Sequence, residues 1–580
     1  MFELTGTPAK LSANEGYKEQ SNYLRGTLAA ELTGDKPDLS PESVQLIKFH
    51  GSYQQEDRDA RKRREQTGVR KFYMFMVRCR IPGGKMTAEQ YLALDDLAGR
   101  LANGTLRFTT RQGIQFHGII KQALQATIAG INRTLLTTLA ACGDVARNIM
   151  CCPAPLRQDG LRAQLQAAAE RLADHLAPRT TAYHEIWLNG EPLKNGELPG
   201  HTPALRSHHG DAVEPIYGKT YLPRKFKAGL TLPEDNCIDV YSQDLGFVAE
   251  VKGEEIIGYN VLVGGGMGMT HGRHDTFPHL AQPICWIPAH RLLALAEAVV
   301  KLYRDHGNRA DRKRARLKYL VAEWGTGKFR GVLEGYAEEP LAPPKPILVQ
   351  AGNLHLGWQA QRDGQFFYGL SIENGRVKDE GNFRLRSALR RLVEEFRPSL
   401  WITPSQDLHL GDLPASARKH LEATLQAHGI RLPGELSAVR KNSMACPAIP
   451  TCGLALTESE RALPGIIDQL EKVLLRLGLD QETITVRMTG CPNGCARPYQ
   501  SDIGLVGRSG DKYLIYVGGR PAGDRLSFPL RDLVPQDRIV PTLAPVLATY
   551  STQRHMGEGF GDFCARIGLA AVQALLPPQK

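Results

Sequence analysis

Long apolar runs and secretion signals are missing from this 580-residue chain. No stretch approaches the roughly 18 consecutive apolar residues that a membrane-spanning helix needs. The first residues, Met1–Pro8, contain neither the basic segment nor the apolar segment of a secretory signal. We therefore expect a protein that does not span the membrane and a cytoplasmic location.

Nucleotide-binding signatures are also missing. No Walker motif occurs, and the glycine run at 264–268 does not complete G-x-G-x-x-G because position 269 is methionine. The basic segments lack the interleaved aromatic residues on which single-stranded nucleic acids stack. We expect no nucleotide site and no nucleic-acid partner, although a basic zinc- or RNA-binding protein remains the alternative from a different class.

Charge and cysteine content point toward anions and metals. Lysine and arginine number 72 against 61 acidic residues, which gives a net charge of +11. This surplus favours an anionic partner, whether nucleic acid, a polyanionic cofactor or a small oxyanion. The 11 cysteines are odd in number and accompany no secretion signal. Metal binding or buried free thiols are therefore favoured over a disulfide framework.

The first clear pattern of secondary structure is an α+β unit. Residues 72–81 alternate as a strand, and a helical apolar pattern follows the capping-box residues Thr87 and Gln90. Two further strands show apolar residues on one face and polar residues on the other. The polar residues on these strands are Arg107, Gln115 and His117. This pattern predicts an antiparallel sheet with one face free to meet a polar ligand.

The unit recurs later in the chain. Thr109, Gln112 and Ile114 match Thr403, Gln406 and Leu408 at an offset of 294 residues, and the same offset relates Cys152-Pro-Ala to Cys446-Pro-Ala. Two further matches follow in the same order, at Asp244 with Asp502 and at Val263 with Val517. The order predicts a duplicated module with a ligand cleft between the copies. The first copy keeps Cys152-Pro-Ala but has no second pair like Cys491 and Cys495.

The repeat and a proline-rich linker suggest six segments. Residues 1–70 are expected to form an N-terminal arm that docks a partner, and 338–346 a linker between the halves. The first half then comprises an α+β repeat at 71–140 and a second domain at 141–337. The second half comprises an α+β repeat at 347–430 and a second domain at 431–580.

Four cysteines form the most specific motif. Cys446 and Cys452 are separated by five residues, Cys491 and Cys495 by three, and an apolar helix at 463–477 lies between the pairs. Four thiolates suit either zinc or an iron–sulfur cluster. Zinc ligand pairs typically have two to four intervening residues, so the wider pair favours a cluster. Structural zinc and two unrelated pairs of buried thiols remain open alternatives.

Basic residues gather in two other segments. Tyr221–Lys227 places Lys225 and Lys227 on one strand face, and Asn308–Lys318 reads as a strongly basic helix. A solvated helix face is the plain interpretation of the second segment, and nucleic-acid binding is the rival functional one.

Taken together, these motifs resemble the siroheme- and [4Fe–4S]-dependent sulfite and nitrite reductases. The resemblance rests on the cysteine motifs, with Thr489–Cys495 the most specific, and extends through Arg107–His117, Tyr221–Lys227 and Asn308–Lys318 to the tail at 557–563. Within the family, Ser21–Gly26 and Phe49–Gln55 most resemble the hemoprotein (beta) subunits of NADPH-dependent assimilatory enzymes. The family fold is α+β, with a ferredoxin-like repeat and a siroheme/iron–sulfur domain occurring twice around a pseudo-twofold axis.

The resemblance implies two cofactors and their ligands. A [4Fe–4S] cluster would be held by Cys446, Cys452, Cys491 and Cys495, with Cys495 also axial to the siroheme iron. Siroheme, with its eight carboxylates, would be contacted by Arg107, Arg111, Gln115, His117, Arg224, Arg309 and Asn493.

The resemblance also implies an activity. Arg78, Arg147, Lys225 and Lys227 would bind sulfite and relay protons during its six-electron reduction to sulfide, a step of cysteine biosynthesis. Nitrite reduction to ammonia is the alternative within the family. Because the chain lacks flavin and NADPH motifs, electrons would come from a partner, in this family a flavoprotein that carries FAD and FMN.

Overall fold

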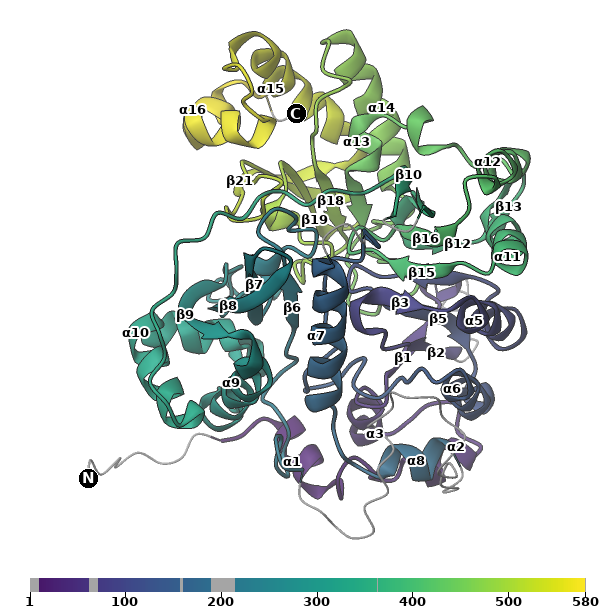
Figure 1. Ribbon diagram of the computed structural model, residues 1–580, viewed down its shortest axis with the longest axis vertical. Helices are drawn as coiled ribbons and strands as arrows, with labels where there is room; N and C mark the ends of the chain where they lie inside the picture. Colours follow the sequence, from purple (N-terminus) through teal and green to yellow (C-terminus); the bar gives the residue numbers. More distant parts are fainter. Residues whose placement is uncertain (1–9, 62–70, 157–159, 189–213, 362–363, 579–580) are drawn as a thin grey trace.

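A computed structural model describes residues 10–61, 71–156, 160–188, 214–361 and 364–578. Figure 1 shows two ferredoxin-like sheets beside one another and two larger α+β modules, one at the top and one at the lower left. Helix α7 (Leu161–His175) stands in the middle, between the first sheet and the lower-left module. The α+β class predicted from the sequence is confirmed.

The first ferredoxin-like sheet has five strands and is covered by α5 (Ala88–Leu101) and α6 (Leu124–Arg133). The predicted capping box is present, because the Thr87 hydroxyl accepts from the Gln90 backbone and the Gln90 side chain accepts from Thr87. In sheet order the strands are β1 (Ser52–Glu56), β2 (Tyr73–Arg78), β5 (Ile114–Ile119), β4 (Leu106–Phe108) and β12 (Arg376–Val377).

The second sheet repeats this arrangement with α11 (Leu385–Phe396) and α12 (Ala417–Ala427). Each sheet takes its last strand from the other half of the chain, since β12 pairs with β4 and β3 pairs with β15. The two halves are therefore interlocked. In sheet order the strands are β10 (Gly357–Ala360), β11 (Phe366–Leu370), β16 (Leu408–Leu413), β15 (Ser399–Ile402) and β3 (Lys85–Met86).

Two glutamines at the predicted repeat positions form reciprocal contacts. Gln112 and Gln406 both adopt positive φ angles, of 55° and 75°. The amide of Gln112 donates to the carbonyl of Ile402 at 3.1 Å, and that of Gln406 donates to the carbonyl of Phe108 at 3.4 Å. These two carbonyls are themselves 294 residues apart. The structure thus confirms the duplication and its offset.

The larger modules are also copies of one another. β6 pairs in parallel with β7 so that Ala228 faces Leu245, and β18 pairs in parallel with β19 so that Val486 faces Ile503, 258 residues further on in both strands. The first module contains β6 (Ala228–Thr231), β7 (Leu245–Lys252), β8 (Glu255–Val263), β9 (Gln282–Pro288), α9 (Leu292–His306) and α10 (Leu317–Ala337). The second contains β17 (Ser443–Ala445), β18 (Val486–Thr489), β19 (Ile503–Ser509), β20 (Lys512–Val517), β21 (Phe528–Pro535), α14 (Leu463–Arg476), α15 (Ile539–Gln553) and α16 (Phe560–Ala574).

The described part of the predicted N-terminal arm is integrated into the fold. Strand β1 is an edge strand of the first sheet, and Leu24, Leu28 and Leu46 are fully buried in the main core. The sequence suggested an independent arm because this region is polar and does not repeat. Its sparse apolar residues nevertheless supply enough contacts to anchor it. The helices here are α1 (Ala13–Gln20), α2 (Leu28–Thr33) and α3 (Pro41–Leu46).

Two local predictions were wrong. Asn308–Lys318 is not a basic helix: Arg312–Arg314 form one 3₁₀ turn, and α10 begins only at Leu317. Lys225 and Lys227 flank Phe226, which forms an isolated bridge with Ala146 before β6 starts.

The predicted helix at 463–477 is confirmed as α14. The remaining elements are α8 (Ala182–Trp187), α13 (Ala438–Lys441), β13 (Asp379–Glu380) and β14 (Phe383–Arg384). None of the helices that the structure describes is both long and apolar enough to cross a membrane.

Candidate metal centre

The four cysteines of the sequence motif lie at one edge of the second module. Cys446 directly follows β17, and Cys491 lies just beyond β18, its parallel neighbour. The carboxyl ends of parallel strands meet at the same edge, so the loops that follow β17 and β18 face one another. The backbone amide of Cys446 donates to the carbonyl of Met488 at 3.1 Å, and that of Gly490 points at the Cys446 sulfur from 3.4 Å. The strands therefore fix where both loops begin.

The thiols are close enough to influence one another. Burial, followed by the charge of Cys495, raises the pKa of Cys446 and of Cys452 and raises that of Cys491 to about 12. Several thiolates without a neutralising cation are thus unfavourable at this site. A bound metal centre supplies the positive charge that stabilises the thiolate forms, as thiolate ligation requires.

The separation of the sulfurs favours a cluster over a single ion. Around one zinc ion, with bonds of about 2.3 Å, thiolate sulfurs would be only about 3.8 Å apart. Within the described residues, no three of these four sulfurs lie within 4.8 Å of one another. A cluster of several irons spreads its ligands more widely. The donor set and its spacing therefore fit an iron–sulfur cluster, and the zinc alternative is disfavoured at these four cysteines.

A loop from the first module closes over the Cys491–Cys495 turn. The Met269 backbone amide donates to the carbonyl of Pro492 at 2.8 Å. A side chain on Gly268 would approach the backbone oxygen of Asn493 to 3.2 Å. The ammonium of Lys318 fixes this loop by donating to the carbonyls of Gly266 and Gly268 at 3.0 and 2.6 Å. Lys318 thus positions the loop, whereas the sequence pattern indicated only a basic segment.

Two lysines form the cationic wall that faces Cys495. Burial and the nearby guanidinium of Arg147 lower the pKa of Lys225 to about 7. Burial and Lys225 itself lower the pKa of Lys227 well below its usual range. The charge of Cys495 acts in the opposite direction on both lysines and raises their pKa. Among the described residues neither ammonium donates a hydrogen bond, so both are free to bind an anion.

Arginines extend this wall. Arg147 donates to the carbonyl of Gly143 at 3.1 Å, and Arg224 lies 3.8 Å from the buried carboxylate of Asp144. Arg111 donates to Gln243 at 2.9 Å, and its buried Nε has no partner among the described residues. Burial, followed by the charge of Arg147, lowers the pKa of Arg111 to about 9. Cations thus outnumber the carboxylates in this wall, as expected of a site for a polyanion.

The polar face of the first sheet completes the site. With its amide oxygen turned toward Arg78, Gln115 accepts from the Nε of that arginine at 3.1 Å. Arg78 also donates to the Cys142 sulfur at 2.8 Å. His117 is buried, and within the described residues neither of its ring nitrogens has a partner. Unpaired buried nitrogens of this kind call for a polar ligand that the protein itself does not supply.

Two predicted ligands already have protein partners. Arg107 pairs with Glu460 at 2.9 Å and donates to the carbonyl of Ala445 at 2.8 Å, next to Cys446. Arg309 pairs with Glu15 of α1 and donates to the carbonyl of Tyr221 at 2.7 Å. Arg107 therefore secures the cysteine loop, and Arg309 secures the segment that leads to Lys225. Cofactor contacts by either remain predictions.

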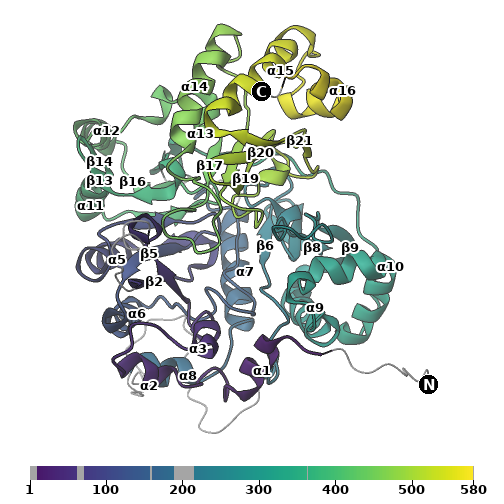
Figure 2. The same cartoon turned by 180° about the vertical axis from the view of Figure 1, so that it is seen from behind.

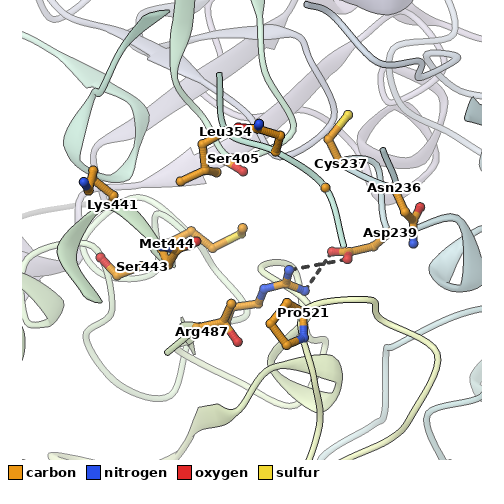
Figure 3. Close-up of a pocket in the computed structure, with 14 residues that line it drawn as sticks. Asn236, Cys237, Asp239, Leu354, Ser405, Lys441, Ser443, Met444, Arg487 and Pro521 are labelled. Atoms are coloured by element: carbon orange, nitrogen blue, oxygen red, sulfur yellow. Dashed lines mark hydrogen bonds and ion pairs between the residues drawn. The ribbon is translucent and has the colours of Figure 1, made fainter. Parts of the chain in front are cut away.

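Some residues that build the centre carry no sequence motif. The buried carboxylate of Asp239 binds Arg487 at 2.7 Å and also pairs with Arg497, joining the first module to the cysteine-bearing one. Figure 3 shows the pair formed by Asp239 and Arg487 at the edge of a pocket between the halves. Glu460 similarly joins Arg107 to Arg376. Isolated charges give no periodic signal, and only the fold reveals these pairings.

Comparison with known proteins agrees with this geometry. The family profile described as "Nitrite and sulphite reductase 4Fe-4S domain" matches residues 167–341 and 438–578. The profile "Nitrite/Sulfite reductase ferredoxin-like half domain" matches residues 70–133. The chain belongs to the nitrite and sulfite reductase family. Membership implies the [4Fe–4S] cluster and siroheme that the sequence resemblance predicted.

Curated relatives cover nearly the whole chain. The "Sulfite reductase [NADPH] hemoprotein beta-component" of Staphylococcus haemolyticus is 42% identical over 97% of this chain and 96% of its own length. That of Myxococcus xanthus is 43% identical over 98% and 99%. The "Sulfite reductase [ferredoxin]" of Synechococcus elongatus is 42% identical over 98% and 91%. Among solved structures, the Mycobacterium tuberculosis NirA protein matches over 97% of both chains with a TM-score of 0.76 and 25% identity.

Proposed function

We propose that this protein reduces sulfite to sulfide with six electrons at siroheme coupled to a [4Fe–4S] cluster, within assimilatory sulfur metabolism. The observation that carries the proposal is the pair Lys225 and Lys227, two ammonium groups that have no hydrogen-bond partner in the described part of the chain and lie within electrostatic reach of Cys495. Relatives named sulfite reductase, 42–45% identical over almost the full chain, support the substrate.

The proposed ligands divide between the two halves. Cys446, Cys452, Cys491 and Cys495 would hold the cluster, with Cys495 shared with the siroheme iron. Together the cofactors supply stored electrons and an iron to which the sulfur of sulfite can bind. Arg111, His117 and Gln115 would contact siroheme, since the first two have buried nitrogens without a partner among the described residues and Gln115 lies against Arg78. Arg224 and the loop residue Asn493 are proposed as further contacts.

The cations would bind the substrate and supply protons. Sulfite near neutral pH is a monoanion or dianion, so Lys225, Lys227, Arg147 and Arg78 would bind its oxygens through charge-assisted hydrogen bonds. A lysine with a pKa of about 7 can release and regain a proton at neutral pH. This property suits a reaction in which each sulfite oxygen must leave as water.

The electron donor is proposed to be an NADPH-linked flavoprotein that carries FAD and FMN. Several similar relatives bear the NADPH hemoprotein name, whereas one of equal identity is named for ferredoxin. Docking by the N-terminal region remains a proposal. Because residues 10–61 contribute β1 and core side chains, deleting this region would disturb the fold as well as any docking. Direct competition between reduced ferredoxin and the flavoprotein is the better one.

A spectrum and an assay with two substrates test the proposal. The protein, produced with siroheme available, should absorb visible light as a coupled heme and iron–sulfur protein. With reduced methyl viologen as donor it should form sulfide from sulfite, with a higher kcat/KM than for ammonia formation from nitrite. A colourless protein would contradict the proposal that siroheme and an iron–sulfur cluster are bound. A higher kcat/KM for nitrite would replace sulfite reduction by the nitrite alternative.

A further inference from the structure

The first module retains two cysteines at the positions that correspond to Cys446 and Cys495. Met150 bridges Gly229 in parallel, just as Met444 pairs with Arg487 in the second module. Cys152 follows the first of these segments as Cys446 follows its counterpart, 294 residues later. Cys237 stands 258 residues before Cys495, at the offset that relates β6 to β18. The two pairs are therefore equivalent in the fold.

Different donors surround this second pair. The Cys152 sulfur lies 3.1 Å from Oδ2 of Asp235, and Nε2 of His355 lies 2.8 Å from the same oxygen. The three donor atoms all lie within 4.8 Å of one another, and all three residues are buried. The Cys237 thiol is hydrogen-bonded to Cys152. One sulfur, one imidazole nitrogen and one carboxylate oxygen thus converge on one point, and Cys237 lies beside this group as the neighbour of Cys152.

The residues behind these donors hold them in place. The backbone amide of Asn353 donates to Oδ1 of Asp235 at 2.9 Å, which leaves Oδ2 directed at the cluster. The other ring nitrogen of His355 lies 3.4 Å from the Gln359 amide oxygen. Supporting hydrogen bonds of this kind orient the ligands of metal sites.

The charges balance around a divalent cation. Two thiolates and one carboxylate carry three negative charges. Arg162, 3.2 Å from Oδ2 of Asp235, supplies one positive charge. A divalent ion bound with neutral His355 would make the group neutral, which a buried site requires. Cys237 and Asn353 also line the pocket in Figure 3, which offers a route for the ion.

We propose that Cys152, Cys237, Asp235 and His355 bind a single zinc ion. The sulfur, nitrogen and oxygen donors of Cys152, His355 and Asp235 lie within 4.8 Å of one another, and Cys237, the neighbour of Cys152, would complete a tetrahedral zinc site. The wider spacing of the other four cysteines matches a cluster instead. Cys152, Asp235 and Cys237 belong to the first half and His355 to the second. The ion would therefore pin the two halves together beside the redox centre.

Metal analysis of the purified holoenzyme tests this site. Elemental analysis should find about one zinc per chain in addition to the iron. His355→Ala should lower the zinc content at least tenfold and leave iron and siroheme unchanged. The matched control is His420→Ala, because His420 is an exposed histidine that pairs with Glu395 on the surface. That variant should keep the zinc.

Two further measurements keep the test decisive if His355→Ala does not fold. Cys237→Ser removes one of the four ligands and should also reduce zinc occupancy. Anomalous diffraction at the zinc edge should place the ion among Cys152, Asp235 and His355 in the wild type. Absence of zinc after growth with added zinc would overturn the proposal. So would zinc that stays in both variants, or a Cys152–Cys237 disulfide found in place of the metal.

Discussion

The two large modules share a backbone and divide the chemistry between them. In both, the backbone amide just before one strand donates to a buried aspartate. Lys227, before β6, donates to Asp244 at 3.0 Å, and Thr485, before β18, donates to Asp502 at 2.9 Å. These contacts are 258 residues apart, yet the side chains differ in kind. The first module presents an ammonium group where the second presents a hydroxyl.

The cysteines show the opposite distribution. Four lie in the second module, whereas the first has Pro233 at the position of Cys491 and Asp235 at that of Asn493. One copy is therefore built to hold a metal cluster, and the other lends its cations to the site of the first. The difference teaches that the fold fixes the positions, and that the residues placed there decide which copy holds the iron–sulfur cluster and which supplies the cations for the anion.

The largest expected effect separates the two equivalent cysteines. Cys495→Ser should abolish sulfite reduction and the electronic coupling of the two cofactors, because a serine oxygen does not replace a shared thiolate. Cys237→Ser, 258 residues earlier, should retain both cofactors. Visible absorption and electron paramagnetic resonance spectra of the two variants measure this directly. If both variants lost the cofactor coupling, or if both kept it, the proposed difference in role between the two modules would be wrong.

Lys227→Asn tests the contribution of the first module to substrate choice. The ammonium has no partner among the described residues, and one charged hydrogen bond to substrate is worth about 1.5–3 kcal/mol. The variant should lose roughly ten- to hundred-fold in kcat/KM for sulfite and much less for nitrite. Siroheme content should not change. Steady-state rates on both substrates with one artificial donor provide the measurement, and an unchanged sulfite-to-nitrite ratio would exclude Lys227 as the discriminating residue.

Asp239→Asn weakens the contact between the modules. Removing one partner of a buried ion pair costs about 3–5 kcal/mol, and here Arg487 and Arg497 would both lose their carboxylate. Thermal denaturation should show a lower midpoint at neutral pH. Although burial opposes it, the charges of Arg487 and Arg497 lower the pKa of Asp239. Its stabilisation is therefore present above the unfolded-state pKa and is lost only as pH falls through the folded-state value. A neutral-pH midpoint equal to that of the wild type would show that the pair does not join the modules.

The smallest effect is expected at the surface of the cysteine module. Arg461 pairs with Asp59 at 2.6 Å, and both side chains are about half exposed. Solvent screens such pairs, so Arg461→Gln should change stability by less than about 1 kcal/mol. Thermal denaturation beside Asp239→Asn gives the comparison. A loss of stability as large as that of Asp239→Asn would show that residues 57–61 are a structural part of the metal centre.

Periodic and motif signals predicted most of the fold. Alternation marked the strands around Arg107 and His117, the capping box at Thr87 marked α5, and the shared offset marked the duplication. The basic segment at 308–318 was wrongly predicted as a helix, because a high density of charge is not a helical periodicity. Its arginines instead bind carboxylates from within a loop, as Arg312 binds Asp144 at 2.8 Å.

The site was predictable only in part. The cysteines and lysines lie in short segments with their own patterns, so the sequence revealed them. Asp239, Glu460 and the group around Cys152 join residues that are distant in the chain, and no local pattern records which partner each will meet. The exchanged strands β3 and β12 are two residues long and gave no strand signal of their own.

Anomalous diffraction at the iron edge of the holoenzyme tests the central claim most directly. The account predicts iron among Cys446, Cys452, Cys491 and Cys495, a further iron beside Cys495, and none among Cys152, Asp235 and His355. Iron at Cys152 and Cys237, or its absence from the four-cysteine site, would contradict the division of roles between the two modules.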